Sequence, residues 1–80
     1  MKYRVGDKVI IASFEVLKNL QKHPENAGNN SVVSDMLQYA GRRTTVSAIT
    51  RDNMDYTLKI DRGAWGWTDA MIAEDEEARK

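Results

Sequence analysis

The stretch RRTTVSAITRDNMDYTLKI, residues 42–60, decides the fold class. Residues 42–50 contain many β-branched and small side chains that can be divided between two faces, which predicts a strand, and in residues 56–60 apolar and polar side chains alternate. Residues 51–55 between them are polar turn formers, so the two strands are expected to form an antiparallel hairpin. On the first strand Thr44, Val46 and Ala48 are predicted to share one face. On the second strand Tyr56, Leu58 and Ile60 are predicted to face the core.

The chain before this hairpin contains one more strand and two helical segments. Residues 8–12 follow the turn pair Gly6-Asp7 and are β-branched, so they are predicted to be the first strand. Ser13 is expected to cap a short helix with apolar residues at helical spacing, namely Phe14, Val16, Leu17 and Leu20. Residues 34–41 are predicted to be a helical turn, which Ser34 caps and Gly41 ends. Residues 23–31, rich in Asn with one Pro and one Gly, are predicted to be a surface loop.

The chain after the hairpin is predicted to form a third strand and a tail. Residues 64–67 place Trp65 and Trp67 on one face of an extended segment. Thr68 and Asp69 can cap a short turn. Residues 74–80 carry the acidic run EDEE and nothing to bury, which predicts a flexible tail after a domain of residues 1–73.

Composition limits the classes of function. A chain of 80 residues without cysteine is expected to be one domain without disulfides, in the cytoplasm. Lys plus Arg and Asp plus Glu both total 12, so the formal net charge is 0, which disfavours nonspecific nucleic-acid binding. The longest apolar run, residues 9–12, is far too short to span a membrane, so no membrane partner is expected.

Four motifs resemble a group of small SH3-like proteins of bacteriophages and prophages of Gram-positive bacteria. They are VGDKV (residues 5–9), DMLQYAGR (35–42), TTV (44–46) and GAWGWTDAMI (63–72). A weaker likeness is to the SH3-like repeats of mind-bomb-type ubiquitin ligases. The resemblance covers roughly residues 3–73 and implies a five-stranded SH3-like barrel with one or two short helices in its long first loop. It implies no catalytic activity, because fold alone does not define function.

Candidate residues for a protein partner come from three parts of the chain. Trp65 is the favoured aromatic anchor, because Trp67 precedes the terminal turn and is expected to be more buried. Tyr39 can extend an aromatic groove, and Phe14 and Leu17 are anchors if their helix is exposed rather than packed on the barrel. Asp69 and Glu74 begin the acidic C-terminal end.

The remaining residues give an alternative site but no catalytic one. Arg42, Arg43 and Lys8 are the candidates for phosphate contacts if the protein binds nucleic acid. His23 is the only histidine, and Asp52, Asp55 and Asp61 lack the spacing of a calcium loop, so neither a catalytic triad nor a metal site is expected. No cofactor-binding motif is present in the sequence.

The sequence therefore predicts a non-enzymatic, phage-type binding module. The expected partner is a protein of the bacterial host, for which this chain would act as adaptor or inhibitor; a polymerase, a sliding clamp or a defence nuclease would be examples. Two alternatives stay open at this point. One is a small nucleic-acid-binding barrel, and the other is a homo-oligomer, such as a homodimer, formed through an exposed strand edge.

Overall fold

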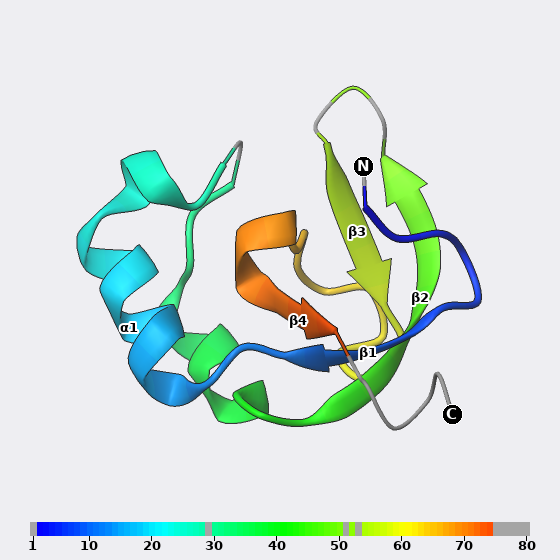
Figure 1. Cartoon of the computed structure of the whole chain (residues 1–80), viewed down its shortest axis with the longest axis horizontal. Coiled ribbons are helices and arrows are strands. Elements are labelled where there is room, and N and C mark those ends of the chain that lie inside the picture. The colour runs from blue at the N-terminus through cyan, green and yellow to red at the C-terminus, as the bar shows by residue number, and fades with distance from the viewer. Residues whose placement is uncertain (1, 29, 51, 53, 75–80) are drawn as a thin grey trace.

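The hairpin of residues 42–60 is present and forms one side of a four-stranded sheet. The computed structural model describes residues 2–28, 30–50, 52 and 54–74. Within them the strands are antiparallel and ordered β3-β2-β1-β4 (Figure 1). The strands are β1 (Lys8–Ile11), β2 (Arg43–Thr50), β3 (Asp55–Leu58) and β4 (Ile72–Glu74). The helices are α1 (Phe14–Lys22) and the 3-10 helices η1 (Pro24–Asn26), η2 (Ser34–Tyr39) and η3 (Asp69–Met71). A small strand-rich domain with short helices is thus confirmed, and its sheet is open.

β2 departs from the strict alternation that its sequence predicts. Its ladder to β3 shifts by one residue between Val46 and Ala48, so Ser47 is the extra residue of a β-bulge. The Ser47 hydroxyl donates to the carbonyl oxygen of Thr57 at 3.1 Å. After the bulge, the side chains of the strand point to the opposite faces of the sheet, so that Ala48 is exposed and Ile49 packs against the core. The prediction that Ala48 shares the face of Val46 is therefore wrong.

The predicted helix caps are partly confirmed. The Ser13 hydroxyl accepts the backbone N–H of Val16 at 3.2 Å, which is the expected N-cap of α1. Ser34 does not cap η2, because the cap residue is Val33 and the Ser34 hydroxyl instead accepts from the Gln21 amide at 3.2 Å. This bond ties η2 to α1. Gly41 ends the segment with a φ of 74°, the left-handed conformation that glycine favours.

α1 packs on the sheet and leaves part of its apolar surface outside. Leu17 and Leu20 are 0% and 6% exposed, whereas Phe14 and Val16 are 54% and 45% exposed. The buried pair lies on one stripe of the helix, and the exposed pair flanks that stripe on both sides. Leu17 therefore belongs to the core and is not available as a surface anchor, contrary to its assignment as a partner-binding candidate.

Residues 64–67 form a turn-rich loop instead of the predicted third strand. Only Trp67 pairs with the sheet, through an isolated bridge to Tyr56. Trp67 is fully buried, and Trp65 is half-buried against the edge of the core, so the two rings do not share a strand face. The described part of the chain thus has four strands and one isolated bridge, where the resemblance implied five strands.

The physical reason for this loop is the carboxylate of Asp61. It accepts the backbone N–H of Gly63 at 3.0 Å, the backbone N–H of Trp65 at 3.1 Å and the indole N–H of Trp67 at 2.9 Å. The backbone coils around one acceptor, which prevents residues 62–66 from extending. Asp61 itself is only 7% exposed, so it is a buried acceptor as well as the turn former that the sequence predicts.

The segment after η3 forms a strand that the sequence did not predict. β4 pairs with β1 in the register Val9↔Glu74, Ile10↔Ala73 and Ile11↔Ile72. The strand reaches Glu74, one residue past the predicted end of the domain. Residues 75–80 of the predicted tail lie outside the described residues.

One core joins the sheet to the helices. Its largest fully buried side chains come from β1, α1, η2, β3 and the segment of residues 67–71. They are Trp67, Tyr56, Ile11, Leu17, Met36, Leu58 and Met71. The helices α1 and η1 lie at the end of the molecule away from the β2–β3 hairpin (Figure 1).

Candidate functional site

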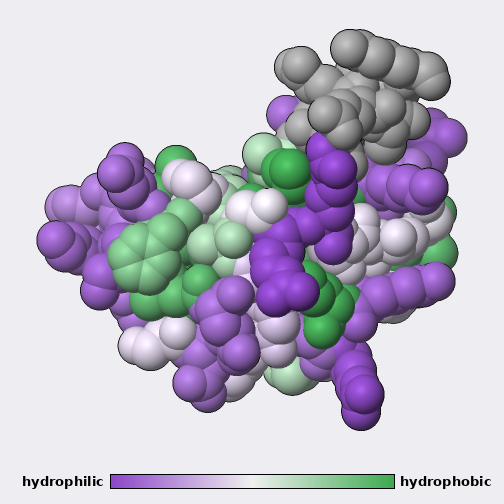
Figure 2. Space-filling view, turned by 90° about the horizontal axis from the view of Figure 1, so that it is seen from below, coloured by the Kyte–Doolittle hydropathy of each residue, from purple (hydrophilic) through white to green (hydrophobic). Residues whose placement is uncertain are grey.

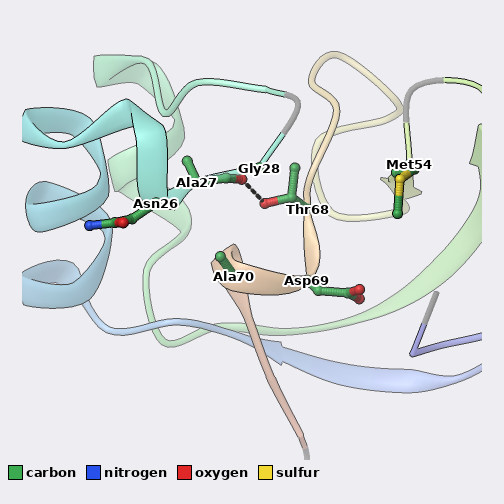
Figure 3. Close-up of a pocket in the computed structure, with 7 residues that line it drawn as sticks. All are labelled: Asn26, Ala27, Gly28, Met54, Thr68, Asp69 and Ala70. Atoms are coloured by element: carbon green, nitrogen blue, oxygen red, sulfur yellow. Dashed lines mark hydrogen bonds between the residues drawn. The ribbon is translucent and has the colours of Figure 1, made fainter.

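An open hollow lies between the η1 end of the helical segment and η3. Its volume is about 250 Å³. Its lining residues are Asn26, Ala27, Gly28, Met54, Thr68, Asp69 and Ala70 (Figure 3). Small-molecule and cofactor sites typically measure about 300–1,000 Å³, so this hollow suits a single side chain or a small group.

The two walls of the hollow are joined by a buried hydrogen bond. The Thr68 hydroxyl donates to the carbonyl oxygen of Ala27, the bond drawn in Figure 3. Ala27 is 0% exposed and Thr68 is 4% exposed, so this contact belongs to the core. At Gly28 the two walls are in van der Waals contact, since a Cβ atom there would lie 3.4 Å from the Thr68 side chain, and the φ of 88° favours glycine. The predicted surface loop of residues 23–31 is therefore anchored at Ala27.

Asp69 provides the charge of the hollow. Its carboxylate accepts the Tyr56 hydroxyl at 2.5 Å, and that hydroxyl in turn accepts the backbone N–H groups of Lys2 and Tyr3 at 2.9 and 3.0 Å. Burial, and then the hydrogen bond to Asp69, raise the pKa of Tyr56 above its ordinary value of 10.0. This chain of bonds fixes the orientation of the carboxylate, which points away from Asn26 (Figure 3). No Lys or Arg among the described residues forms an ion pair with it.

Met54 provides the largest apolar side chain of the hollow. It is 54% exposed, and its φ of 55° is uncommon for a residue other than glycine, asparagine or aspartate. Figure 3 places Met54 and Asn26 at opposite ends of the group of lining residues. A ligand in the hollow would thus meet a carboxylate on one side and a thioether chain on another.

The buried carboxylate of Asp55 supports a loop next to the hollow. Asp55 is 7% exposed and accepts a hydrogen bond from the Asn30 side-chain amide. Gly66 packs directly on this pair, since a Cβ atom there would lie 2.6 Å from the Asn30 amide nitrogen. Asp55 is therefore a structural acceptor that joins the 30s loop to β3 and to the loop before Trp67.

Within the described residues, the aromatic side chains do not form the groove that the sequence suggested. Tyr56 is fully buried, and Tyr39 is half-buried with its ring edge-on to Trp67, at 6.3 Å between centroids and 74° between planes. Trp65 is half-buried against the core. Of the predicted partner-binding residues whose side chains the structure describes, namely Trp65, Tyr39, Phe14, Leu17 and Asp69, only Asp69 lines the hollow.

The other predicted residues lie on separate surfaces. Phe14 and Val16 flank the buried stripe of α1, and a hydrophobic patch bordered by hydrophilic side chains is visible over this end of the molecule in Figure 2. Lys8 of β1 and Arg43 of β2 are exposed, as is Arg42 just before β2. The Glu74 backbone belongs to β4.

Most residues of the hollow could not be selected from the sequence. Asn26, Ala27 and Gly28 come from the predicted loop, Met54 from the hairpin turn, and Thr68 and Ala70 from the terminal turn. These three segments are far apart in the chain, and no local pattern indicates that they meet. The motif WTD, residues 67–69, is the one signal, because it brings a buried ring, a hydroxyl and a carboxylate together.

Comparisons with known proteins do not assign this chain to a protein family. No protein-family model, curated protein or solved structure matches this chain. Among the described residues, no group of three or more His, Asp or Glu side chains is placed to hold a metal ion. In the same part of the chain, every helix is too short or too polar to cross a membrane.

Proposed function

We propose that this protein is a non-enzymatic binding module that recognises another protein through the hollow. The observation that carries the proposal is an oriented Asp69 carboxylate, without a cationic partner among the described residues, beside the exposed side chain of Met54. A lysine or arginine side chain of a partner fits both features, because its charged end can pair with the carboxylate while its methylene stem contacts the thioether.

The size of the hollow supports a single anchoring side chain rather than a complete interface. A specific interface buries about 800 Å² on each partner. The whole surface of this chain is 5223 Å², so roughly one sixth of it would be covered. The surface around the hollow must therefore take part as well, beyond the residues that line it.

The identity of the partner rests on the sequence resemblance. Likeness to small phage and prophage proteins supports a protein of a Gram-positive host as the partner and the bacterial cytoplasm as the location. Acting as an adaptor or an inhibitor of that protein is part of the same proposal. The proposal also includes a relation to SH3-like barrels. It is supported by the order of β1, β2 and β3 in the sheet and by the bridge between Tyr56 and Trp67.

The proposal is tested by capture from a Gram-positive bacterial lysate with matched variants. Asp69→Asn removes the charge and keeps an acceptor for Tyr56, and Met54→Asn removes the apolar chain at a backbone conformation that asparagine tolerates. Val5→Asn is the control, since Val5 is an equally exposed apolar residue, at 61%, that does not line the hollow. A protein recovered with wild type and Val5→Asn, but lost with the two hollow variants, supports the proposal.

Two other outcomes would contradict it. Equal recovery with all variants would place the interface elsewhere on the molecule. Recovery that disappears after nuclease treatment, and that falls steeply with salt concentration, would indicate a nucleic-acid-binding module instead.

A further inference from the structure

The strand register gathers three cationic side chains on the solvent side of the sheet. In an antiparallel pair, directly opposed residues lie on the same face. Lys8 is opposite Thr45, and Ile10 is opposite Arg43. Because Lys8 and Ile10 are two residues apart on one strand, all four side chains share that face.

Lys59 joins this group from the other side of β2. Its backbone N–H donates to the carbonyl oxygen of Thr45 at 3.0 Å, and the preceding residue, Leu58, is the register partner of Val46. Since Leu58 is 0% exposed and neighbouring side chains alternate, Lys59 points to the opposite, solvent side, where it is exposed. Lys59 and Lys8 therefore stand on either side of Thr45.

We name this surface the basic face, and define it by Lys8, Ile10, Arg43, Thr45 and Lys59. Its two lysines have no ion-pair partner among the described residues. Ile10 is half-buried and lies next to Lys8 and Arg43, so the face also contains a partly exposed apolar side chain beside its cations. The formal net charge of 0 therefore conceals a local concentration of positive charge on the sheet.

We infer that the basic face binds an acidic segment of a protein. Charge complementarity selects an anionic partner, and the exposed part of Ile10 can contact an apolar side chain of that segment. Single-stranded nucleic acid fits less well, because the face has no aromatic side chain on which a base could stack. Three cations on a chain of net charge 0 also give little of the long-range attraction on which nucleic-acid binding depends.

This inference is independent of the hollow, which carries the opposite charge and is lined by other residues. A basic partner segment would occupy the hollow, and an acidic one would occupy the basic face. A variant of one surface can therefore lose its binding while the other surface keeps its own.

The test is a titration of the full chain, labelled with ¹⁵N, by poly-L-glutamate and separately by oligothymidylate at equal charge concentration. With poly-L-glutamate, the amide signals of residues 8–10, 43–45 and 59 should shift first. An exposed ion pair changes affinity by about 1.4- to 5-fold, and reversing a charge replaces attraction with repulsion. The double variant Lys8→Glu, Lys59→Glu should therefore weaken binding by about tenfold or more.

Matched variants separate a local effect from a general one. Lys22→Glu reverses one lysine charge in the last turn of α1, away from the basic face, and should alter affinity less than about twofold, whereas Lys8→Glu or Lys59→Glu alone should alter it more. Lys8→Gln with Lys59→Gln removes the charges without adding repulsion and should give an intermediate loss. Well-dispersed amide spectra will show that each variant is folded.

Three results would overturn the inference. Tighter binding of oligothymidylate at the same residues would identify a nucleic-acid surface. An equal loss from Lys22→Glu would indicate nonspecific attraction. Absence of shifts at the basic face with poly-L-glutamate would show that this surface does not bind acidic chains.

Discussion

Replacing Asp61 with alanine is expected to be among the most destabilising single changes in this protein. Its carboxylate accepts three N–H groups, from Gly63, Trp65 and the Trp67 indole, at 3.0, 3.1 and 2.9 Å. The indole belongs to a side chain that is 0% exposed, so alanine would leave a buried donor without an acceptor. The two backbone bonds that coil the loop would be lost together with it.

These contacts give the expected loss in the free energy of unfolding. An unsatisfied buried donor costs about 1–3 kcal/mol, and each of the two backbone bonds contributes about 0.5–1.5 kcal/mol, so the total is about 2–6 kcal/mol. A chain of 80 residues is expected to have a free energy of unfolding of about 4–12 kcal/mol. Asp61→Ala should therefore remove a large fraction of the stability, whereas Asp61→Asn, which keeps one acceptor oxygen, should lose less than Asp61→Ala.

Urea unfolding followed by tryptophan fluorescence measures both losses. The combined emission of Trp65 and Trp67 reports the packing of this loop, and far-ultraviolet circular dichroism will show whether the remaining sheet unfolds in the same transition. A loss below about 1 kcal/mol for Asp61→Ala, which is the ordinary range for surface substitutions, would refute this account of the loop.

Three further predictions concern the core and the residues next to the hollow. Leu17→Ala should destabilise by about 2–5 kcal/mol and Phe14→Ala by less than about 1 kcal/mol in thermal unfolding, and equal losses would contradict the placement of α1. Burial and the Asp69 hydrogen bond raise the pKa of Tyr56, so as the pH rises the Tyr56 hydroxyl ionises in the unfolded chain before it ionises in the folded protein. Above about pH 10 wild type should therefore lose stability that Tyr56→Phe does not lose. Parallel pH profiles of the two proteins in urea unfolding would contradict this. Gly66→Ala should displace the Asn30 amide and disrupt its bond to Asp55, seen as shifted Asn30 side-chain signals, and an unchanged spectrum would contradict the close packing.

Local sequence patterns predict those elements whose conformation depends on their own side chains. The alternation in residues 43–50 predicts β2, the Ser13 hydroxyl predicts the start of α1, and Gly41 predicts the left-handed residue after η2. The stronger burial of Trp67 relative to Trp65 was also predicted correctly. For β2, the cap of α1 and Gly41, the cause lies within a few residues of the effect.

The remaining features depend on contacts between distant segments. Residues 64–67 have the composition of a strand, but the Asp61 carboxylate competes successfully for their N–H groups. β4 has too few residues to give a pattern, and it forms because β1 offers a free edge to it. In β2, the extra residue Ser47 reverses the facing of the residues after it, and alternation alone cannot indicate this change.

The candidate site was predictable only at Asp69. The hollow combines this carboxylate with segments near residues 27 and 54, and the bond between Thr68 and Ala27 joins residues that are 41 positions apart in the chain. Lys8 and Arg43 of the basic face were named from the sequence as candidates for phosphate contacts, but the inclusion of Lys59 required the β2–β3 register. Arg42, the third cation suggested by the sequence, precedes β2.

The most direct test of the proposed function is the amount of partner captured by Asp69→Asn relative to wild type, measured by quantitative mass spectrometry in nuclease-treated Gram-positive lysate. The proposal predicts one protein that is retained by wild type and by Val5→Asn and is depleted about fivefold or more by Asp69→Asn, as expected for losing a charge-assisted bond of about 1 kcal/mol or more. Equal capture by the folded Asp69→Asn variant would contradict the assignment of the hollow as the binding site.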